Sequence, residues 1–590
     1  MLTNLSGPAR GEPSESELRK AADRARAAVA AAPEGEAAVA ALREAVQRYA
    51  KAFPRQRREI PEDAPAIRDA RQFIAQGALE PAEVLLREHL AKNRNDPPAM
   101  HMMAEIAALC DLREDAERIL KRSGQIHADS ARAMADLGMT MHRIACQKDI
   151  PEFVFHAAQA LDQAIELDPA NELVRAFKAS MMMQTRNMEQ ARTDYEALIE
   201  LNPHGPAHWL NYGYLLKTFG EFGAALAAYR TALSLAPEIG TGWWALADLK
   251  GARMFPRDIE EMEALLDDDT LSDESRVDVR FALAQALDKA KEYERAIFHL
   301  EEGSALRRRI QTEERDVVSG GLGFVQYVFT REFFAAREGW GDPRPGPIFI
   351  VGMHRAGSTL VEQILSSHPD IEGTEELFIL HQFAGELDRA NPRRFPFEII
   401  SDLGEEDFRT LGERYFEISS RSQRTDRPFF TDKNPANWRF LGLIHCMLPN
   451  AKIIDVRRNP MDCCFANYTR HYRVGVNHSY SLAGMGQYYR EYVGAMRHFD
   501  EVLPGRIHRV IHDDLVDDLE GQVRRLLDYI GLPFDERCLR FFETERAVHT
   551  PSSGQVREPI NRKGFGRWRS YEPWLGELKE ALGETLEDWR

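Results

Sequence analysis

The spacing of hydrophobic residues divides the chain into two regions of different character. Up to about residue 310, apolar and small residues recur at the three- and four-residue intervals of amphipathic helices. After residue 346, short apolar runs alternate with stretches of helical spacing, and buried strands separated by helices are typical of a parallel sheet. The four expected strands are PIFIVGM (347–353), RPFFTD (427–432), KIIDV (452–456) and RIHRVIH (506–512). The pattern therefore predicts an all-helical region followed by an α/β domain.

Local composition places the boundaries between these regions. The first 15 residues are rich in Gly, Pro, Ser and charged residues, which predicts a disordered tail, and the Ala-rich stretch at 16–55 predicts one or two helices. The segment GWGDPRPGP before residue 346 marks a boundary, because Gly and Pro interrupt regular structure. We expect four parts, namely a tail with leading helices at 1–61, a helical repeat array at 62–310, a linker at 311–345 and the α/β domain at 346–590.

An internal repeat runs through the helical region. Pro169, Pro203 and Pro237 are 34 residues apart, and so are Trp209 and Trp243. Pairs of small residues twelve positions apart recur at Ala70/Ala82, Ala104/Ala116, Ala145/Ala157, Ala179/Ala191, Gly213/Ala225 and Ala284/Ala296. Small residues let two antiparallel helices cross closely, and Pro ends the second helix because it cannot continue the hydrogen-bond ladder. The period predicts a stack of helical pairs rather than a generic Ala-rich bundle.

The repeat resembles the tetratricopeptide repeat, and its sharpest copy is residues 206–239. The residues at that family's positions are Trp209, Gly213, Ala225, Tyr229, Ala232 and Pro237. We count about seven copies over 62–310, with a seven-residue insertion near 147–153 and a degenerate copy around 240–275. The resemblance implies a solenoid whose groove binds a peptide or protein. Pairing of two chains into a homodimer stays open as an alternative use of the array.

Composition limits the partners and the compartment. The 590 residues carry a net charge of −18, which disfavours a general nucleic-acid or anionic-membrane binder, so an anionic ligand needs a local basic site. Six cysteines without a CxxC pair predict neither a disulfide framework nor a structural zinc site. No signal-peptide core and no run of about 18 apolar residues occurs, so we expect a cytoplasmic protein without a membrane partner.

The first expected strand leads into a loop bounded by Gly352 and Gly357, and a helical stretch follows. In such an arrangement, loop N–H groups and the helix N-terminus bind a phosphate group. Ser358 stands where a Walker A loop has Lys, and the cation comes three residues earlier, at Arg355. This argues against a nucleoside triphosphate with Mg²⁺ and favours a ligand with one phosphate group at this end. A P-loop kinase, which would bind ATP with Mg²⁺, is kept as an alternative.

This loop resembles that of the sulfotransferases that use 3′-phosphoadenosine-5′-phosphosulfate (PAPS), in which the pattern after the strand is x-[KR]-[SA]-G-[ST]-[ST]. The matching residues are Arg355, Ala356, Gly357, Ser358 and Thr359. The resemblance implies that these residues bind the 5′-phosphosulfate of the cofactor.

The next stretch, LVEQILSSHPDIEGTEEL, resembles the tyrosylprotein sulfotransferases and their bacterial relatives. By its spacing from Arg355, Glu376 falls on that family's catalytic base, with Glu375 as the fallback. A solvated helix start is the plain structural alternative for this pair of carboxylates. Lys433, in the sequence Asp-Lys-Asn-Pro, resembles the family's catalytic Lys; otherwise it is a surface residue after an edge strand. The resemblance thus implies that Glu376, Arg355 and Lys433 are catalytic.

The segment after the 452–456 strand resembles the family's 3′-phosphate motif. Arg458 would pair with the phosphate through its planar guanidinium, and Arg457 is the alternative. The family pattern has a Ser eight residues later, where this chain has Ala466. Either that hydrogen bond is missing, or Asn467 or a backbone N–H replaces it, so the affinity for the cofactor is in question.

The most basic window of the α/β domain is 549–575. It resembles the late loop that closes over the adenosine and 3′-phosphate in sulfotransferases, and it contributes Arg562, Lys563 and Gly564 as candidate cofactor-binding residues. A solvated basic loop is the alternative interpretation.

The leading hypothesis is transfer of a sulfuryl group from PAPS to an acceptor hydroxyl, without a metal ion. A general base would activate the acceptor while cations stabilise charge on the leaving oxygen. The resemblance favours peptide tyrosine as the acceptor, with carbohydrate, lipid and small phenols also open. The second hypothesis is a catalytically inactive repeat scaffold that retains nucleotide binding, which the Ala at position 466 slightly favours.

Overall fold

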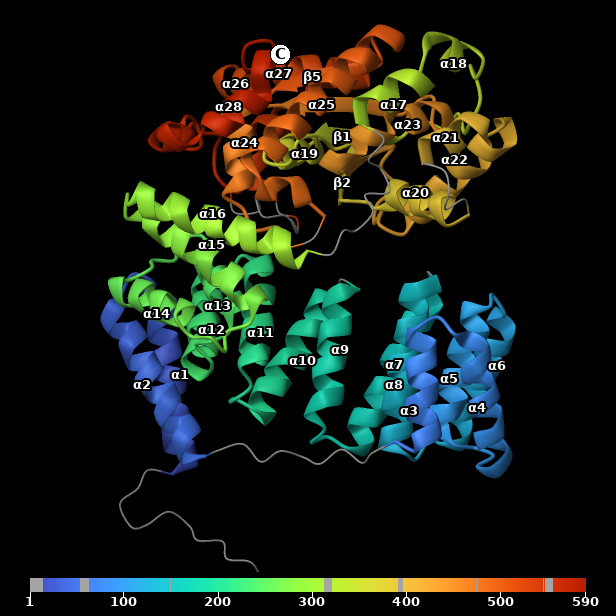
Figure 1. Cartoon of the computed structure of the whole chain (residues 1–590), viewed down its shortest axis with the longest axis vertical. Helices are drawn as coiled ribbons and strands as arrows, with labels where there is room; N and C mark the ends of the chain where they lie inside the picture. Colours follow the sequence, from blue (N-terminus) through green and yellow to red (C-terminus); the bar gives the residue numbers. More distant parts are fainter. Residues whose placement is uncertain are drawn as a thin grey trace, which may run out of the picture. The chain divides into compact units, whose positions relative to one another are not determined.

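A computed structural model describes residues 14–53, 63–148, 150–185, 187–311, 321–390, 396–473, 475–544, 546 and 555–590. The chain forms two compact units, Met1–Arg253 and Met254–Arg590. Both are drawn in Figure 1 with the labels used below. The tail expected at 1–15 lies outside the described residues, except for its last two positions.

The N-terminal unit consists of helices. The two leading helices are α1 (Glu15–Ala31) and α2 (Glu36–Ala52). The repeat helices are α3 (Pro65–Ala75), α4 (Leu79–Lys92), α5 (Pro97–Leu109), α6 (Arg113–Ile126), α7 (Ala131–Lys148), α8 (Pro151–Leu167), α9 (Glu172–Gln184), α10 (Met188–Leu201), α11 (Pro206–Phe219), α12 (Phe222–Leu235) and α13 (Gly240–Ala247). The order of these helices confirms the predicted tetratricopeptide-like region.

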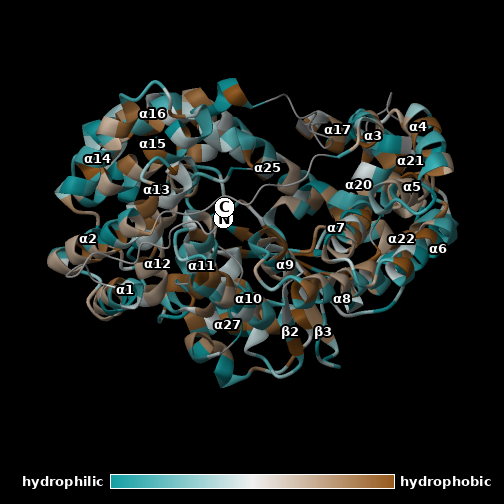
Figure 2. Ribbon diagram, turned by 90° about the horizontal axis from the view of Figure 1, so that it is seen from below, coloured by the Kyte–Doolittle hydropathy of each residue, from teal (hydrophilic) through white to brown (hydrophobic). Residues whose placement is uncertain are grey.

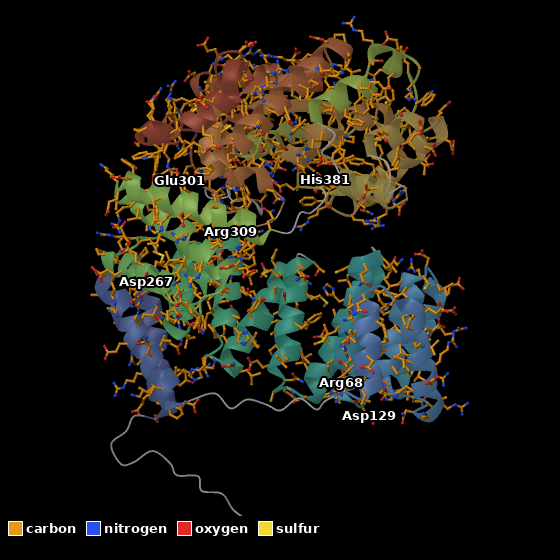
Figure 3. The ribbon with its side chains drawn as sticks, in the orientation of Figure 1. Arg68, Asp129, Asp267, Glu301, Arg309 and His381 are labelled. Atoms are coloured by element: carbon orange, nitrogen blue, oxygen red, sulfur yellow. The ribbon has the colours of Figure 1, made fainter. Side chains whose placement is uncertain are left out.

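Local sequence signals explain where several of these helices begin and which side they bury. Asp96 caps α5 and Asn171 caps α9, because each side chain accepts a hydrogen bond from an N–H in the first turn. Polar and apolar residues alternate around the helices as teal and brown bands in Figure 2. Exposed charged side chains include those of Arg68 on α3 and Asp129 in the turn between α6 and α7 (Figure 3).

The small residues of the repeat lie buried where paired helices cross. At Gly213 a Cβ would stand 2.5 Å from the ring of Tyr229, the large residue that fills the space beside the crossing. The insertion expected near 147–153 lengthens α7 and α8 to 18 and 17 residues, where α5 and α6 have 13 and 14. The extra residues therefore extend two helices instead of forming a long loop.

The leading helices pack on α12, far from their neighbours in the sequence. Ten consecutive residues of α12, 225–234, are buried, which is unusual for a repeat helix and follows from its being covered on an additional side. At the crossing, a Cβ on Gly223 would stand 2.3 Å from the carbonyl oxygen of Ala30. The guanidinium of Arg26 lies 4.2 Å from the ring centroid of Trp209. The leading helices at 16–55 precede the array in the sequence, but they pack against one of its helices.

We expect Gly223→Ala to lower the free energy of unfolding by about 1–3 kcal/mol, because its methyl group would collide with the backbone of α1. Alanine in a helix otherwise stabilises by about 0.5–1 kcal/mol relative to glycine, so the sign of the change is diagnostic. Urea unfolding of the full chain measures it. Gly576→Ala is the matched control, since a Cβ there meets nothing within 4 Å. A gain in stability for both variants would contradict the close crossing.

The C-terminal unit contains a five-stranded parallel sheet, which confirms the predicted α/β domain. The strands are β1 (Pro347–Gly352), β2 (Ile371–Glu375), β3 (Phe429–Lys433), β4 (Lys452–Arg457) and β5 (Ile507–Ile511), in the order β2-β3-β1-β4-β5. Four of them fall on the predicted apolar runs. The pattern does not predict β2, because this edge strand has the polar sequence IEGTE and a register shift between Glu372 and Glu375.

This unit also contains helices that precede, separate and follow the strands in the sequence. They are α14 (Pro256–Leu266), α15 (Asp273–Lys289), α16 (Tyr293–Ile310), α17 (Gly321–Val328), α18 (Arg331–Ala335), α19 (Ser358–Ser366), α20 (Ile379–Ala390), α21 (Pro396–Asp402), α22 (Glu405–Ser420), α23 (Leu441–Met447), α24 (Pro460–Tyr468), α25 (Leu482–Val502), α26 (His512–Asp517), α27 (Leu519–Ile530) and α28 (Gly576–Leu582). Short 3₁₀ helices are η1 (Pro435–Phe440), η2 (Asn477–Tyr480), η3 (Glu536–Glu543), η4 (Arg567–Trp574) and η5 (Gly583–Leu586).

The compact unit begins earlier than the boundary that Gly and Pro suggest. It includes α14 to α16, which the repeat spacing assigns to the array. In the expected linker 311–345, residues 312–320 lie outside the described residues, but α17 packs on α25. Phe329 is fully buried, with its ring centroid 5.9 Å from that of Phe499. The described part of 311–345 therefore belongs to the folded unit.

Candidate active site

The loop after β1 has the backbone of an anion-binding loop. It leads into the N-terminus of α19, where the first N–H groups have no partner within the helix. Arg355 and Gly357 both have positive φ, 63° and 107°. A Cβ on Gly357 would stand 2.6 Å from the ring of His512, and one on Gly352 would stand 2.3 Å from the carbonyl oxygen of Val456. The two glycines are therefore required by close packing as well as by the turn.

A cavity of about 390 Å³ opens at this loop. The loop lines it with Arg355, Gly357, Ser358 and Thr359, whereas Ala356 is fully buried and does not line it. The remaining walls come from the end of β4 with α24, from the end of β5, and from the late segment at 555–567. The cavity thus joins the anion loop, the segment after β4 and the late basic segment, but Lys433 does not line it.

Arg458 and Arg457 point to different places although they are neighbours. Arg458 lines the cavity, and its Nη atoms donate to the carbonyl oxygens of Arg355 (3.2 Å) and Gly564 (2.6 Å). Its Nε is buried and has no hydrogen-bond partner among the described residues. Arg457 is fully buried, with Nη2 2.8 Å from the carboxylate of Asp455. Arg457 therefore holds the core, and it does not reach the cavity as the alternative phosphate ligand.

Ala466 lines the cavity, but Asn467 does not. The side chain of Asn467 is 1% exposed, and its Nδ2 donates to the carbonyl oxygens of His354 (2.7 Å) and Cys463 (2.9 Å). Its Oδ1 accepts a hydrogen bond from Tyr472 (2.7 Å). The amide is fully used in these contacts, so the structure gives Asn467 a role in supporting the anion loop and not the expected place in the cavity wall.

Two of the three residues expected from the late segment reach the cavity. Lys563 and Gly564 line it, whereas Arg562 does not. Arg562 instead forms an ion pair with Asp517 of α26, and its side chain is 65% exposed. The basic window is therefore only partly directed at the site.

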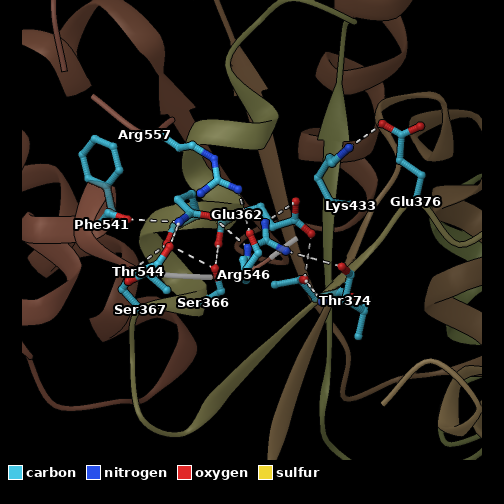
Figure 4. A network of polar contacts seen from close by, with 12 residues as sticks. Glu362, Ser366, Ser367, Thr374, Glu376, Lys433, Phe541, Thr544, Arg546 and Arg557 are labelled. Carbon is cyan, nitrogen blue, oxygen red and sulfur yellow. Dashed lines mark hydrogen bonds and ion pairs between the residues drawn. The ribbon is translucent and has the colours of Figure 1, made fainter. Parts of the chain in front are cut away.

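Glu376 and Lys433 meet at the carboxyl ends of β2 and β3 (Figure 4), and Lys433 Nζ donates to Glu376 Oε1. The side chain of Lys433 is 1% exposed and that of Glu376 is 35% exposed. Lys433 pairs with Ile350 of β1, two residues before the anion loop begins at Gly352. This carboxylate–lysine pair therefore lies at the same end of the sheet as the loop, where ligands bind in parallel sheets. The side chain of Glu375 lies outside the part of the chain that the structure describes.

Two neutral histidines border the anion loop. Burial is the main cause that lowers the pKa of His354 to about 4 and that of His512 to about 3, and nearby arginines lower both further. The charges of Glu376, Lys433 and Arg355 all act on His354, so the catalytic candidates lie within electrostatic range of one residue. At neutral pH the positive charge of the site therefore comes from Arg and Lys.

A network of polar contacts supports the ends of β2 and β3 (Figure 4). Thr374 N donates to Thr431 Oγ1 (3.1 Å), and Thr431 Oγ1 donates to Glu362 of α19 (3.1 Å). The other carboxylate oxygen of Glu362 lies 2.9 Å from Arg546. Because the two threonines stand two residues before the members of the carboxylate–lysine pair, the network holds both strand ends in place.

Sequence patterns do not single out three side chains at this site, those of Glu362, His512 and Arg546. His512 directly follows β5, and the position after a parallel strand is a signal that could have found it. Glu362 and Arg546 offer no such signal, since a helix carboxylate and a loop arginine are usually exposed. Only their burial in the folded unit distinguishes them.

Cys463 and Cys464 lie buried in α24, where burial raises the pKa of the Cys463 thiol to about 12, so that it is not a nucleophile at neutral pH. Among the described residues, no group of three or more His, Cys, Asp and Glu is arranged to hold a metal ion. None of the helices in the described ranges has the length and apolar character needed to cross a membrane.

Two family models match the chain. Residues 347–536 match the model of the sulfotransferase family, and residues 209–239 match that of the tetratricopeptide repeat. The first range contains the anion loop, the carboxylate–lysine pair and Arg458. It ends before the late segment at 555–567.

Individual proteins are similar to parts of the chain. An uncharacterized protein of Aquifex aeolicus (strain VF5) is 28% identical over 424 residues, which is 69% of this chain and 54% of that protein, so the chain spans about half of its length. The "Putative protein-tyrosine sulfotransferase" of Caenorhabditis briggsae is 23% identical over 231 residues, 38% of this chain and 80% of that protein. The solved sulfotransferase domain of the Synechococcus PCC 7002 olefin synthase shares 20% identity at a TM-score of 0.29, covering 40% of this chain and 90% of that one. The family-model match identifies residues 347–536 as a sulfotransferase-family domain, in a chain whose residues 209–239 match the tetratricopeptide repeat.

Proposed function

We propose that the chain transfers a sulfuryl group from PAPS to an acceptor hydroxyl and releases adenosine 3′,5′-bisphosphate. The observation that carries the proposal is the carboxylate–lysine pair beside an anion loop, at one end of the sheet of a sulfotransferase-family domain. A base, buried cations and an anion-binding loop are the groups that such a transfer needs.

The loop side of the cavity suits the 5′ end of the cofactor. Arg355, Ser358 and Thr359 offer a guanidinium and two hydroxyls, and the N-terminus of α19 adds N–H groups. Because no Lys stands at position 358, this donor set suits one phosphate group with its sulfuryl substituent better than the β- and γ-phosphates of ATP.

The other cavity residues suit the 3′-phosphate. Arg458 and Lys563 would bind it, Arg567 lies in the same wall, and Gly564 allows the backbone to approach. Two buried ring or guanidinium nitrogens of cavity residues, Arg458 Nε and His512 Nδ1, have no hydrogen-bond partner among the described residues. A buried polar atom without a partner costs free energy, so a polar ligand in the cavity would relieve that cost.

Bound PAPS would supply an activated sulfuryl group, and the chain's own residues would assist its transfer. Glu376 is partly exposed, so its carboxylate is accessible to an acceptor and would take the proton of the hydroxyl. Lys433 and Arg355 would stabilise the negative charge that develops on the leaving phosphate oxygen. The ion pair with Lys433 holds the carboxylate in one orientation, which is the positioning that in-line transfer requires.

The second candidate function is a repeat scaffold that binds the nucleotide without transferring the sulfuryl group. Ala466 favours it, because a methyl group lines the cavity where the family pattern has a hydroxyl. The carboxylate–lysine pair opposes it, since nucleotide binding alone has no need of a base beside a buried Lys.

We also propose that the helical array binds a peptide or protein, as arrays of this kind do. Peptide tyrosine is the acceptor to test first, because the relative from C. briggsae is named a protein-tyrosine sulfotransferase. A homodimer formed through the array is the alternative, which light scattering of the purified chain would reveal.

The proposal is tested by thermal shift with adenosine 3′,5′-bisphosphate, followed by incubation of the full chain with ³⁵S-labelled PAPS and fractionated cell extract. We expect the nucleotide to raise Tm and the label to appear in one fraction, which identifies the acceptor class. A raised Tm without label in any fraction would support the scaffold. Stabilisation by ATP with Mg²⁺ in place of the bisphosphate would indicate a kinase.

A further inference from the structure

Helix α15 carries two carboxylates that contact later segments of the C-terminal unit, one after α24 and one in the 567–571 region. By sequence α15 belongs to the repeat array, but it lies in the same compact unit as the sheet. Asp278 and Asp288 are ten residues apart, so their positions are separated by about 15 Å along the helix. Each contacts an Arg from a different segment near the cavity.

Asp278 holds the segment that follows α24. It is 5% exposed, and Arg473 Nη2 lies 2.7 and 2.8 Å from its two oxygens. His471 Nε2 lies 3.0 Å from Oδ1, and the ring of His471 stacks on Phe281 at 5.0 Å. Helix α16 adds Arg307, which donates to the carbonyl oxygen of Arg473. His471 and Arg473, the two neighbours of Tyr472 in the sequence, are therefore both held by contacts with the helical pair α15–α16.

Tyr472 connects this segment to the anion loop. Its hydroxyl donates to Asn467 Oδ1 (2.7 Å), and Asn467 Nδ2 donates to the carbonyl oxygen of His354 (2.7 Å). His354 directly precedes Arg355, which lines the cavity. A continuous series of contacts thus runs from Asp278 of α15 to the loop.

Asp288 holds a second wall of the cavity. Arg567 Nη2 lies 2.8 Å from Oδ2, and the hydroxyl of Tyr571 donates to Oδ1 at 2.6 Å. Arg567 itself lines the cavity. The ring of Tyr571 also lies 4.7 Å from that of Phe465, another lining residue. Residues 567 and 571 are therefore held by α15, and Tyr571 also packs against α24.

We propose that Asp278 and Asp288 are positioning residues for the nucleotide site, so that α15 is a working part of the transferase as well as a repeat helix. This inference rests on the proposed function. Each loop that is held in its binding conformation beforehand loses less conformational entropy when the nucleotide binds. Removal of either carboxylate should therefore weaken nucleotide binding although neither residue lines the cavity.

The test is Asp288→Asn in the full chain, with Glu274→Gln as the control, because Glu274 is an exposed carboxylate in the first turn of the same helix. We expect the affinity for adenosine 3′,5′-bisphosphate to fall roughly three- to thirtyfold in Asp288→Asn, the range for residues that act through others. The ion pair is partly exposed, with side-chain exposures of 45% and 18%, so Tm should change by only about 4 °C or less. Asp288→Glu should recover most of the affinity.

Hydrogen exchange without ligand gives a readout that does not depend on the proposed function. We expect faster exchange at residues 566–574 in Asp288→Asn and unchanged exchange in Glu274→Gln. Asp278→Asn should likewise weaken binding. Because Asp278 is buried, its substitution could prevent folding, and the partly exposed pair of Asp288 and Arg567 then still decides the test. Unchanged affinity together with unchanged exchange in Asp288→Asn would overturn the inference. A wild-type chain that does not bind the bisphosphate would refute the proposed function, and exchange would then still decide the role of α15.

Discussion

Glu376→Gln is expected to lower the rate of sulfuryl transfer by roughly 10²–10⁴-fold and to leave the affinity for adenosine 3′,5′-bisphosphate nearly unchanged. The amide cannot accept the proton of the acceptor hydroxyl, but its oxygen can still accept the hydrogen bond from Lys433. The rate is measured with ³⁵S-labelled PAPS and the acceptor fraction, and the affinity by calorimetry.

Glu375→Gln is the matched control for this experiment, because it removes the same charge one residue earlier. We expect it to keep most of the activity. If Glu375→Gln lost transfer while Glu376→Gln kept it, the base would be Glu375. Normal turnover in both variants would remove a carboxylate base at this position from the mechanism.

A weaker nucleotide affinity in Glu376→Gln would point to a different role for the carboxylate. Lys433 is almost fully buried, and a buried cation without its counter-charge is costly. In that outcome the main work of Glu376 would be to keep Lys433 in place, and the proton would have to leave the acceptor by another route.

Arg458→Ala is expected to weaken binding of adenosine 3′,5′-bisphosphate by roughly 30- to 1,000-fold, because loss of one charged partner in a desolvated site costs about 2–4 kcal/mol. Arg458 also donates to the carbonyl oxygens of Arg355 and Gly564, so its loss would loosen both walls of the cavity. Calorimetry measures the affinity, and thermal unfolding shows how much of the loss comes from altered folding.

Arg562→Ala is the control for Arg458, since the sequence assigns both residues to the cofactor and the structure separates them. Arg562 is paired with Asp517 and does not line the cavity, so we expect its affinity to stay within about threefold of wild type. Arg458→Lys should recover only part of the binding, because an ammonium keeps the charge without the planar fork. Equal losses in Arg458→Ala and Arg562→Ala would show that the 3′-phosphate lies elsewhere.

Most of the fold follows from short-range patterns. The 34-residue period predicts the helical pairs, because the same small residues recur wherever two helices cross. Four strands follow from apolar runs, since a strand buried on both faces has little room for polar residues. The edge strand β2 is an exception, because its backbone pairs with β3 on one side and its sequence IEGTE is polar. The packing of α1 and α2 on α12 is not predicted by such patterns either, because the periodicity of a helix shows which of its sides is buried but not which surface covers that side.

Residue types and spacing alone predicted the candidate site: an anion loop with Ser358 at the Walker lysine position and Arg355 as its cation, the carboxylates Glu375 and Glu376, and Lys433 after an apolar strand. They also determined where the helical pairs and four of the strands lie. These conclusions depend on residue types and on spacing along the chain, which the fold does not change.

Which of two neighbouring side chains enters the cavity depends on the folded structure. Arg457 and Arg458 have the same charge, but at the end of β4 the side chain of Arg457 is buried in the core and that of Arg458 lines the cavity. Ala466 and Asn467 are separated in the same way by the turn of α24, and only Ala466 lines the cavity. The structure also brought Asp278 and Asp288 of a repeat helix to Arg473 and Arg567, which lie 195 and 279 residues later in the chain. Side-chain direction and contacts between distant segments depend on how elements pack, and no local pattern in the sequence contains that information.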